Sequence, residues 1–335
     1  MDENQSMNDI SVSKNSQQSF FQLTPDQVLD AIESTGLLPQ AALLALNSYE
    51  NRVYQFRDDD ENKFVVKFYR PRRWTDEQIL EEHGFSLQLA ENEIPVIPPL
   101  RFNDQTLLKF NGFRFSIFEC RGGRTPELED KKTLQWIGRF IGRIHAIGEI
   151  QPFVHRPELT INSFAEKSVD FLLSANFIPP HILPAYRAIT EQLIEISYQK
   201  FNALGHFNSI RLHGDCHPSN ILWTDDGPHF VDFDDARMGP AVQDLWMLIN
   251  DASERELWNK LLEGYEDFME FDDQQLKIVE PLRTIRMIHY SAWLARRWED
   301  PSFKHNFPWF NTSRYWEEHI LSLKEQLAVI QQQHF

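Results

Sequence analysis

The sequence lacks the features that mark secreted, membrane-spanning and nucleic-acid-binding proteins. Only two cysteines, Cys120 and Cys216, occur in 335 residues, and no apolar run reaches the roughly 18 residues that a membrane-spanning helix requires. Residues 1–19 carry no apolar signal-peptide core. With 50 acidic against 33 basic residues the formal net charge is −17, which repels nucleic-acid phosphates. We therefore expect a cytoplasmic protein without a disulfide, a membrane segment or a nucleic-acid partner.

Apolar material, in contrast, is plentiful. The chain is 41% hydrophobic and contains 26 Phe and 9 Trp, enough for a substantial core. Its length of 335 residues suits two lobes better than one small core. Residues 1–19, rich in Ser, Asn and Gln, are expected to form a disordered tail.

The most informative segment is residues 210–235, where two apolar runs enclose a polar loop that reads HGDCHPSN. A turn signal at Asp225-Asp226-Gly227 separates the second run from a further strand that ends in VDFDD. This order predicts a β-hairpin with Asp215 and Asn220 before it and Asp232 at its far end.

That arrangement suits phosphoryl transfer. The reaction needs a carboxylate that orients and deprotonates the attacking hydroxyl, and oxygen ligands that hold Mg²⁺ on the nucleotide phosphates. We assign Asp215 as the catalytic base and Asn220 and Asp232 as the metal ligands, so that Asp232 is the second active-site carboxylate. The Asp-x-x-x-x-Asn spacing is that of the protein-kinase catalytic loop.

The match departs from ordinary eukaryotic protein kinases. Gly214 replaces the usual Arg before the catalytic Asp, Asp234 stands where Asp-Phe-Gly has its Gly, and no Ala-Pro-Glu follows. The His-Gly-Asp-x-His-x-x-Asn form resembles the aminoglycoside phosphotransferase and choline kinase branch of the kinase-like superfamily. The resemblance implies an α+β, bilobal protein-kinase-like fold with a small β-rich N-terminal lobe and a larger helical C-terminal lobe.

The N-terminal lobe is expected over residues 20–119. Two strands flank the loop 47–52, and residues 64–69 form a third strand that carries Lys67. Kinases place a Gly-rich phosphate loop and a phosphate-binding Lys at these positions. This loop contains no glycine, so Ser48 is assigned to ATP binding by position alone.

Lys67 has two interpretations: a solvent-facing strand residue, or a phosphate ligand held by a carboxylate on the next helix. That helix is expected over residues 79–91, after a capping box formed by Thr75 and Gln78. Glu81 and Glu82 both lie on it, and we choose Glu82, seven residues before Leu89. Glu81 is then expected to be a solvated acid.

A Pro-rich edge strand is expected over residues 94–100, and a hairpin follows over residues 106–118. The hairpin leads into Phe118, Glu119 and Cys120, which stand where a kinase hinge binds adenine through its backbone. A plain interdomain linker is the alternative.

The C-terminal lobe, residues 120–335, is expected to be helical. Gly138 and Gly142 would allow another element to pack closely, and His145 suits a packed core histidine better than a ligand. A helix is expected to begin near Gly239, with Asp244 accepting hydrogen bonds from the catalytic-loop backbone. Arginines and aromatic residues near the C-terminus line an acidic-substrate cleft or are simply solvated or ion-paired: Arg283, Arg286, Tyr290, Trp293, Arg296, Arg297 and Trp298.

Five longer stretches resemble the bacterial stress response kinase A family, and the resemblance covers nearly the whole chain after residue 20. They are NSYENR at 47–52, VVKFYRP at 65–71, ILEEH at 79–83, RLHGDCH at 211–217 and VDFDDAR at 231–237. The resemblance implies a cytoplasmic, monomeric, ATP- and Mg²⁺-dependent serine/threonine protein kinase that counters stress-induced cell death. It also implies that the partner is a protein substrate with a Ser or Thr hydroxyl.

Two other functions share the kinase-like fold. A small-molecule kinase acting on an aminoglycoside, choline, homoserine or a sugar would use the same loop, because fold does not determine substrate. A non-catalytic, kinase-shaped binding module would be expected to have lost its ligands, yet Lys67, Asp215, Asn220 and Asp232 are all present.

A metallohydrolase is the remaining alternative. Its ligands would be His213, Asp215, Cys216 and His217, because imidazole and thiolate suit zinc. Pro218 ends any helix that would bring both histidines to one face.

Overall fold

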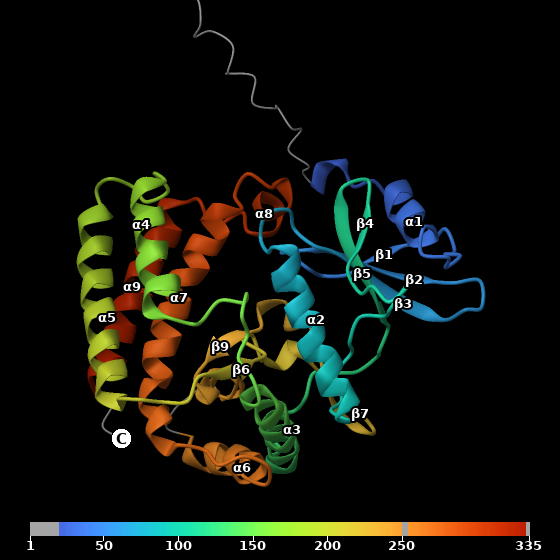
Figure 1. The fold of residues 1–335 in the computed structure, drawn as a ribbon. Coiled ribbons are helices and arrows are strands. Elements are labelled where there is room, and N and C mark those ends of the chain that lie inside the picture. The colour runs from blue at the N-terminus through green and yellow to red at the C-terminus, as the bar shows by residue number, and fades with distance from the viewer. Residues whose placement is uncertain (1–19, 250–253, 333–335) are drawn as a thin grey trace, which may run out of the picture. The chain divides into compact units, whose positions relative to one another are not determined.

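The computed structural model describes residues 20–249 and 254–332, which divide into two compact units (Figure 1). One unit takes in the chain up to Leu80 together with Pro99–Cys120. The other takes in Glu81–Pro98 and the chain from Arg121 onward. Residues 81–98, expected in the N-terminal lobe, are therefore grouped with the second unit, and the expected tail at 1–19 lies outside the described residues.

The first unit is built on a five-stranded antiparallel sheet in the order β1-β2-β3-β5-β4. Apolar residues of the sheet, including Phe56, Phe68 and Phe115, form a core with Val28 and Ile32 of helix α1. The elements, in chain order, are η1 (Phe20–Gln22), α1 (Pro25–Glu33), β1 (Leu44–Ala45), β2 (Arg52–Arg57), β3 (Lys63–Phe68), β4 (Leu108–Phe110) and β5 (Phe113–Glu119).

The predicted capping box at Thr75 and Gln78 is confirmed, and a second box precedes α1. At the start of α1, the Gln27 N–H donates to the Thr24 hydroxyl and the Gln27 side chain accepts from the Thr24 N–H. Thr75 and Gln78 make the same pair of bonds, at 2.9 and 3.3 Å, before α2 (Asp76–Glu91). Each box satisfies two backbone donors that the first helical turn leaves unpaired.

The edge strand expected over residues 94–100 is wrong. Only two isolated bridges form there, Val96 with Phe230 and Pro99 with Phe118. The segment contains three prolines, at 95, 98 and 99, which have no N–H to donate to a neighbouring strand.

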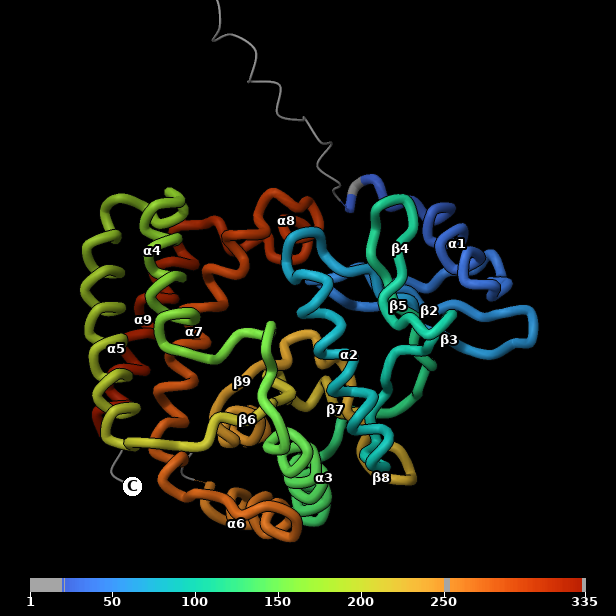
Figure 2. Tube along the Cα trace, viewed as in Figure 1, coloured from blue at the N-terminus to red at the C-terminus, as the bar shows by residue number. Residues whose placement is uncertain are grey.

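The second unit is mainly helical, and α4, α5, α7 and α9 lie side by side in both views (Figures 1 and 2). No helix in the described ranges is both long enough and apolar enough to cross a membrane. The helices are α3 (Lys131–Glu149), η2 (Asn162–Glu166), α4 (Lys167–Ser174), α5 (Leu183–Leu204), α6 (Arg255–Tyr265), η7 (Asp273–Ile278), α7 (Val279–Arg296), α8 (Pro301–Asn306) and α9 (Ser313–Gln332).

Helices α3 and α6 pack at the close distance that the glycines predict. A Cβ atom on Gly138 would lie 2.1 Å from the carbonyl oxygen of Leu261, and one on Gly142 would lie 2.5 Å from that of Tyr265. On α6, a Cβ on Gly264 would lie 2.0 Å from the carbonyl oxygen of Gln135. Only glycine fits at these contacts without moving a backbone.

The strands of the second unit flank residues 213–220, the segment predicted to be the catalytic loop. The predicted hairpin is confirmed as β7 (Ile221–Thr224) and β8 (Gly227–Phe230). A second pair, β6 (Ile210–Leu212) with β9 (Arg237–Gly239), brackets the whole segment. Short 3₁₀ turns complete it: η3 (Pro218–Asn220), η4 (Phe233–Asp235), η5 (Ala241–Asp244) and η6 (Trp246–Leu248), so the helix expected from Gly239 is 3₁₀ rather than α-helical.

Candidate active site

The catalytic loop needs a glycine immediately before Asp215. Gly214 has a φ of +84°, in the left-handed region, and a Cβ atom there would lie 2.2 Å from the carbonyl oxygen of Asp235. An arginine at this position would meet both the conformational penalty and the clash. The close approach therefore explains the departure from the eukaryotic protein-kinase motif.

Asp244 fixes the backbone of this loop, as predicted. Its carboxylate accepts the N–H groups of His213, at 2.7 Å, and Gly214, at 2.8 Å. His145, fully buried on α3, lies 3.1 Å from the same carboxylate through Nε2 and 3.0 Å from the Tyr265 hydroxyl through Nδ1. His145 is thus a core histidine that supports the loop through Asp244.

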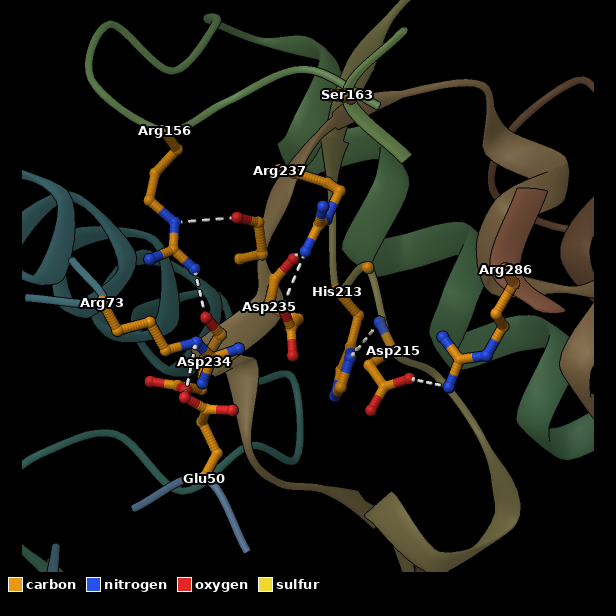
Figure 3. Close-up of polar contacts among 12 residues, drawn as sticks. Glu50, Arg73, Arg156, Ser163, His213, Asp215, Asp234, Asp235, Arg237 and Arg286 are labelled. Carbon is orange, nitrogen blue, oxygen red and sulfur yellow. Dashed lines mark hydrogen bonds and ion pairs between the residues drawn. The ribbon is translucent and has the colours of Figure 1, made fainter. Parts of the chain in front are cut away.

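Both carboxylate oxygens of Asp215 face cationic or proton-donating groups. Arg286 Nη2 on α7 lies 2.6 Å from Oδ1 (Figure 3). His217 Nε2 lies 3.5 Å from Oδ2. The His217 Nδ1 atom accepts the Ser219 N–H at 3.2 Å, which leaves the ring proton on Nε2, facing Asp215. Burial pushes the pKa of Asp215 upward, but the bond from His217 and the charge of Arg286 outweigh it, so the pKa is lowered.

Asn220 and Asp232 are brought to the same loop by two hydrogen bonds. The Asn220 side-chain nitrogen donates to the Asp215 carbonyl oxygen at 3.0 Å, so Oδ1 is the Asn220 side-chain atom that could hold a metal ion. The Val231 N–H donates to the Asn220 carbonyl oxygen, also at 3.0 Å. Asp232 follows in the left-handed region, with φ of 63° and ψ of 63°, and is exposed.

These residues fit magnesium better than a soft metal. A carboxylate and an amide oxygen are hard ligands, and Mg²⁺ commonly uses one or two carboxylates with substrate phosphates and waters. Burial raises the pKa of Cys216 well above its usual value, which keeps it a thiol, and His213 Nε2 pairs with the Val231 carbonyl oxygen at 2.9 Å. Within the described ranges no three His, Cys, Asp or Glu side chains are grouped to hold a metal ion, so the metallohydrolase hypothesis finds no support.

The two candidate acids on α2, Glu81 and Glu82, have different surroundings. Glu82 is buried, at 5% exposure, and its charge stabilises the guanidinium of Arg156. The expectation that Glu81 is a solvated acid is wrong: its carboxylate accepts the backbone N–H groups of Val154, His155 and Arg156. The sequence around Glu81 could not predict this contact, because the contact depends on the conformation of a loop about 70 residues away.

In the first unit, the solvent-facing interpretation of Lys67 is wrong. Lys67 is 8% exposed, pairs with Val53 and Ser116 across the sheet, and places its ammonium 5.4 Å from the ring centroid of Tyr69. Ser48 lies in the connection between β1 and β2 and is half-buried.

Ion pairs hold the glycine-free β1–β2 connection. The Asn51 side chain accepts the Arg70 N–H at 3.0 Å, and the Arg70 side chain donates to the carbonyl oxygens of Tyr49 and Glu50. Arg73 adds an ion pair with Glu50 at 3.5 Å (Figure 3). The loop is therefore shaped by arginines rather than by glycine flexibility.

The expected hinge residues lie at the end of β5. Phe118 and Glu119 close that strand opposite Val65 and Phe64. The Cys120 N–H donates to the Lys63 carbonyl oxygen at 3.0 Å and so extends the pairing by one residue.

The arginines of α7 divide by partner. Arg283 pairs with the buried Glu280 at 3.1 Å, and Arg286 pairs with Asp215. Arg296 donates to the Lys167 carbonyl oxygen at 3.2 Å. The sequence indicated Arg286 only as one of several possible cleft residues and did not predict its contact with Asp215.

Comparison with known proteins identifies relatives over nearly the full length. Residues 43–279 match the model of a family described as the phosphotransferase enzyme family. The chain is 46% identical over 320 residues to stress response kinase A of Escherichia coli, covering 95% of this chain and 97% of the relative. It is 43% identical over 314 residues to the serine/threonine protein kinase RdoA of Salmonella typhimurium, covering 93% and 95%.

Solved structures confirm the predicted kinase-like α+β fold. An amicoumacin kinase in complex with AMP-PNP, Ca²⁺ and its ligand superposes with a TM-score of 0.71 at 18% identity, covering 91% of this chain and 94% of that one. A microcompartment-associated aminopropanol kinase gives a TM-score of 0.69 at 16% identity, covering 91% and 96%. At these identities the likeness concerns the fold alone.

Proposed function

This chain belongs to the phosphotransferase enzyme family, and we propose that it is an ATP- and Mg²⁺-dependent serine/threonine protein kinase. The observation that carries the proposal is that hydrogen bonds join Asn220 to Asp215 and to Val231, the residue immediately before Asp232. A relative of matching length that is named as a serine/threonine protein kinase favours a protein acceptor over a small molecule.

Asp215 is the catalytic base of the proposed reaction. Arg286 donates to Oδ1 at 2.6 Å, and His217 Nε2 faces Oδ2 at the longer distance of 3.5 Å. We assign Oδ2 to orient the acceptor hydroxyl and take its proton, so the hydroxyl shares this oxygen with His217. The lowered pKa keeps Asp215 in the carboxylate form that this role requires. The hydroxyl oxygen forms the new bond to the γ-phosphorus as the bond to the ADP oxygen breaks, and the proton passes through Asp215 to solvent.

Asn220 Oδ1 and the Asp232 carboxylate would hold the magnesium ion. When bound, the ion neutralises the charge that develops on the transferred phosphoryl group and orients the phosphates. As a magnesium ligand, Asp232 is the second active-site carboxylate beside Asp215.

We propose two lobes, residues 20–119 and 120–335, and assign the nucleotide-binding residues from the corresponding positions of kinases. Lys67 binds the α- and β-phosphates, Glu82 orients Lys67, and Ser48 contacts phosphate from the β1–β2 connection. The backbone of Phe118, Glu119 and Cys120 binds adenine. The burial of Lys67 and Glu82 supports a role for both charges beyond simple solvation.

The names of the relatives also suggest the cellular setting. We propose a cytoplasmic, monomeric enzyme that acts in a stress response and protects cells from stress-induced death.

A radiolabelled-ATP assay tests the proposal directly. Purified protein should label a protein substrate on Ser or Thr and leave a panel of aminoglycosides, choline, homoserine and sugars unlabelled. A phosphoproteomic comparison of cells carrying the parent protein or Asp215→Ala should reveal the substrates as sites lost in the variant. Labelling of a metabolite alone would instead assign a small-molecule kinase.

A further inference from the structure

Glu81 ties the loop that precedes Leu159 to helix α2. Its carboxylate accepts the N–H of Val154, that of His155 at 2.8 Å and that of Arg156 at 2.7 Å. Adjacent backbone N–H groups that converge on one anion form a strong binding site for it. An otherwise exposed stretch, in which Val154 is 80% exposed, is thereby held to one position on the helix.

Arg156, at the end of that stretch, reaches the loop that contains Asp232. It is 5% exposed, and it donates from Nε to the Ala236 carbonyl oxygen at 2.7 Å and from Nη2 to the Asp234 carbonyl oxygen at 2.5 Å (Figure 3). Burial lowers the pKa of Arg156, while the nearby carboxylates of Glu82, Asp234 and Asp235 act in the opposite direction and favour its charged form.

Asp232 is consequently held on both sides. Before it, the Val231 N–H is bonded to the carbonyl oxygen of Asn220, the other proposed metal ligand. After it, the Phe233 ring packs 4.4 Å from the ring of His213, between centroids, and Arg156 binds the carbonyls two and four residues on. The left-handed conformation of Asp232, which is uncommon for a residue other than glycine, needs such support.

We propose that Glu81 and Arg156 are positioning residues that together set the geometry of the metal-binding loop around Asp232. Glu81 fixes residues 154–156 through their backbone, and Arg156 passes that position on to the carbonyls of Asp234 and Ala236. The inference rests on the proposed function, because the metal role of Asp232 is part of it. Neither residue touches the metal or the substrate in this scheme.

The expected change in magnesium affinity can be taken from the effect of comparable supporting residues in other metal sites. Removing a group that orients a metal ligand typically weakens metal affinity by about 10- to 100-fold. Loss of the guanidinium also leaves two buried carbonyl oxygens without their donor, so the loop can relax away from its present shape.

The test is a magnesium titration by calorimetry in the presence of a non-hydrolysable ATP analogue, which does not depend on turnover. Arg156→Met, which keeps the length of the side chain but removes its donors, should raise the magnesium Kd by about 10- to 100-fold. Arg156→Lys, which retains one donor group, should recover part of the loss. Glu81→Gln, which removes the charge that binds three N–H groups, should also weaken magnesium binding.

Arg143 supplies a matched control. Its Nη2 donates to the carbonyl oxygens of Asn92, at 2.9 Å, and Glu93, at 3.1 Å, just beyond the C-terminal end of α2, rather than to carbonyls of the segment 231–236. Arg143→Met should therefore bind magnesium like the parent. Parent-like magnesium affinity in Arg156→Met, with a cooperative thermal transition, would overturn the inference.

Two further variants keep the outcome decisive. If Arg156→Met does not fold, Glu81→Gln decides, and unchanged magnesium affinity in it rejects the positioning role. Asp232→Asn separates this inference from the proposed function. If Asp232→Asn loses magnesium while Arg156→Met keeps it, only the positioning role fails, whereas unchanged binding in Asp232→Asn removes the metal assignment itself.

Discussion

Replacing Asp215 with asparagine tests the proposed chemistry most directly. The substitution keeps the size and shape of the side chain but removes the charge that accepts the hydroxyl proton. In the parent, that charge faces Arg286 Nη2 at 2.6 Å and His217 Nε2 at 3.5 Å. The Asn220 side chain binds the Asp215 backbone carbonyl, so that contact survives the change.

The effect of Asp215→Asn on the free energy of unfolding should be much smaller than its effect on the activation free energy. The Arg286 side chain is 39% exposed and can return to water when its partner is lost, so the ion pair contributes at most about 1 kcal/mol to folding. A positioned general base typically contributes about 10²–10⁴-fold to the rate. That range corresponds to about 3–5 kcal/mol of activation free energy, well above the stability term.

Two measurements check the expectation. Calorimetry should show ATP affinity close to that of the parent, because Lys67, Asn220 and Asp232 are unchanged. Phosphotransfer at saturating ATP should fall by at least about two orders of magnitude. Asp225→Asn is the control, because it makes the same charge change in the exposed turn of the same hairpin. If Asp215→Asn binds ATP normally and transfers phosphate at the parent rate, Asp215 is a structural loop residue and the mechanism is wrong.

Three further predictions concern other charges. Asp232→Asn should stay folded, since Asn tolerates the left-handed region, but should lose turnover in a magnesium titration of the rate; an unaltered magnesium dependence would exclude Asp232 as a ligand. Glu82→Ala should cripple phosphotransfer in the radiolabelled assay, and parent-like activity would mean that another carboxylate orients the phosphate-binding lysine. Lys109 and Arg114 hold the pKa of Asp76 below its usual value, so its stabilising contribution is present above the unfolded carboxyl pKa of about 3.9 and is lost as the pH falls through the folded value. Thermal melts at decreasing pH should show this loss in the parent and a smaller one in Asp76→Asn.

The catalytic loop was predictable because its determinants are local. Asp215 and Asn220 are five residues apart, and the turn before Gly227 returns the chain to Asp232. Asp244 could be placed as well, because its position after the hairpin is that of a known support for this loop.

Contacts between distant segments were not predictable in the same way. Arg286 reaches Asp215 across 71 residues, and a long charged side chain carries no local sign of its partner. The three N–H groups that bind Glu81 belong to a loop without any periodic pattern. The pairing of β6 with β9 involves strands of only three residues each, too short for alternation to be read.

Two secondary-structure predictions were wrong, at residues 94–100 and from Gly239 onward. The apolar run at 94–100 has the composition of a strand, but its prolines remove the donors that a ladder needs. The turns from Ala241 to Leu248 are 3₁₀ rather than α-helical; there the Asp244 carboxylate binds the catalytic-loop backbone.

The glycine contact between α3 and α6 has a consequence for how tolerance to mutation should be interpreted. His145 on α3 and Tyr265 on α6 are hydrogen-bonded to each other, and His145 also contacts Asp244. A methyl group at Gly138 or Gly142 would clash with the α6 backbone and displace the hydrogen bonds that link Tyr265, His145 and Asp244. Neither glycine takes part in the proposed reaction. In a scan of all substitutions scored by growth, these two positions should therefore look as intolerant as catalytic residues. Intolerance to substitution in such a scan would therefore identify residues that set the distance between two helices as well as residues of the active site.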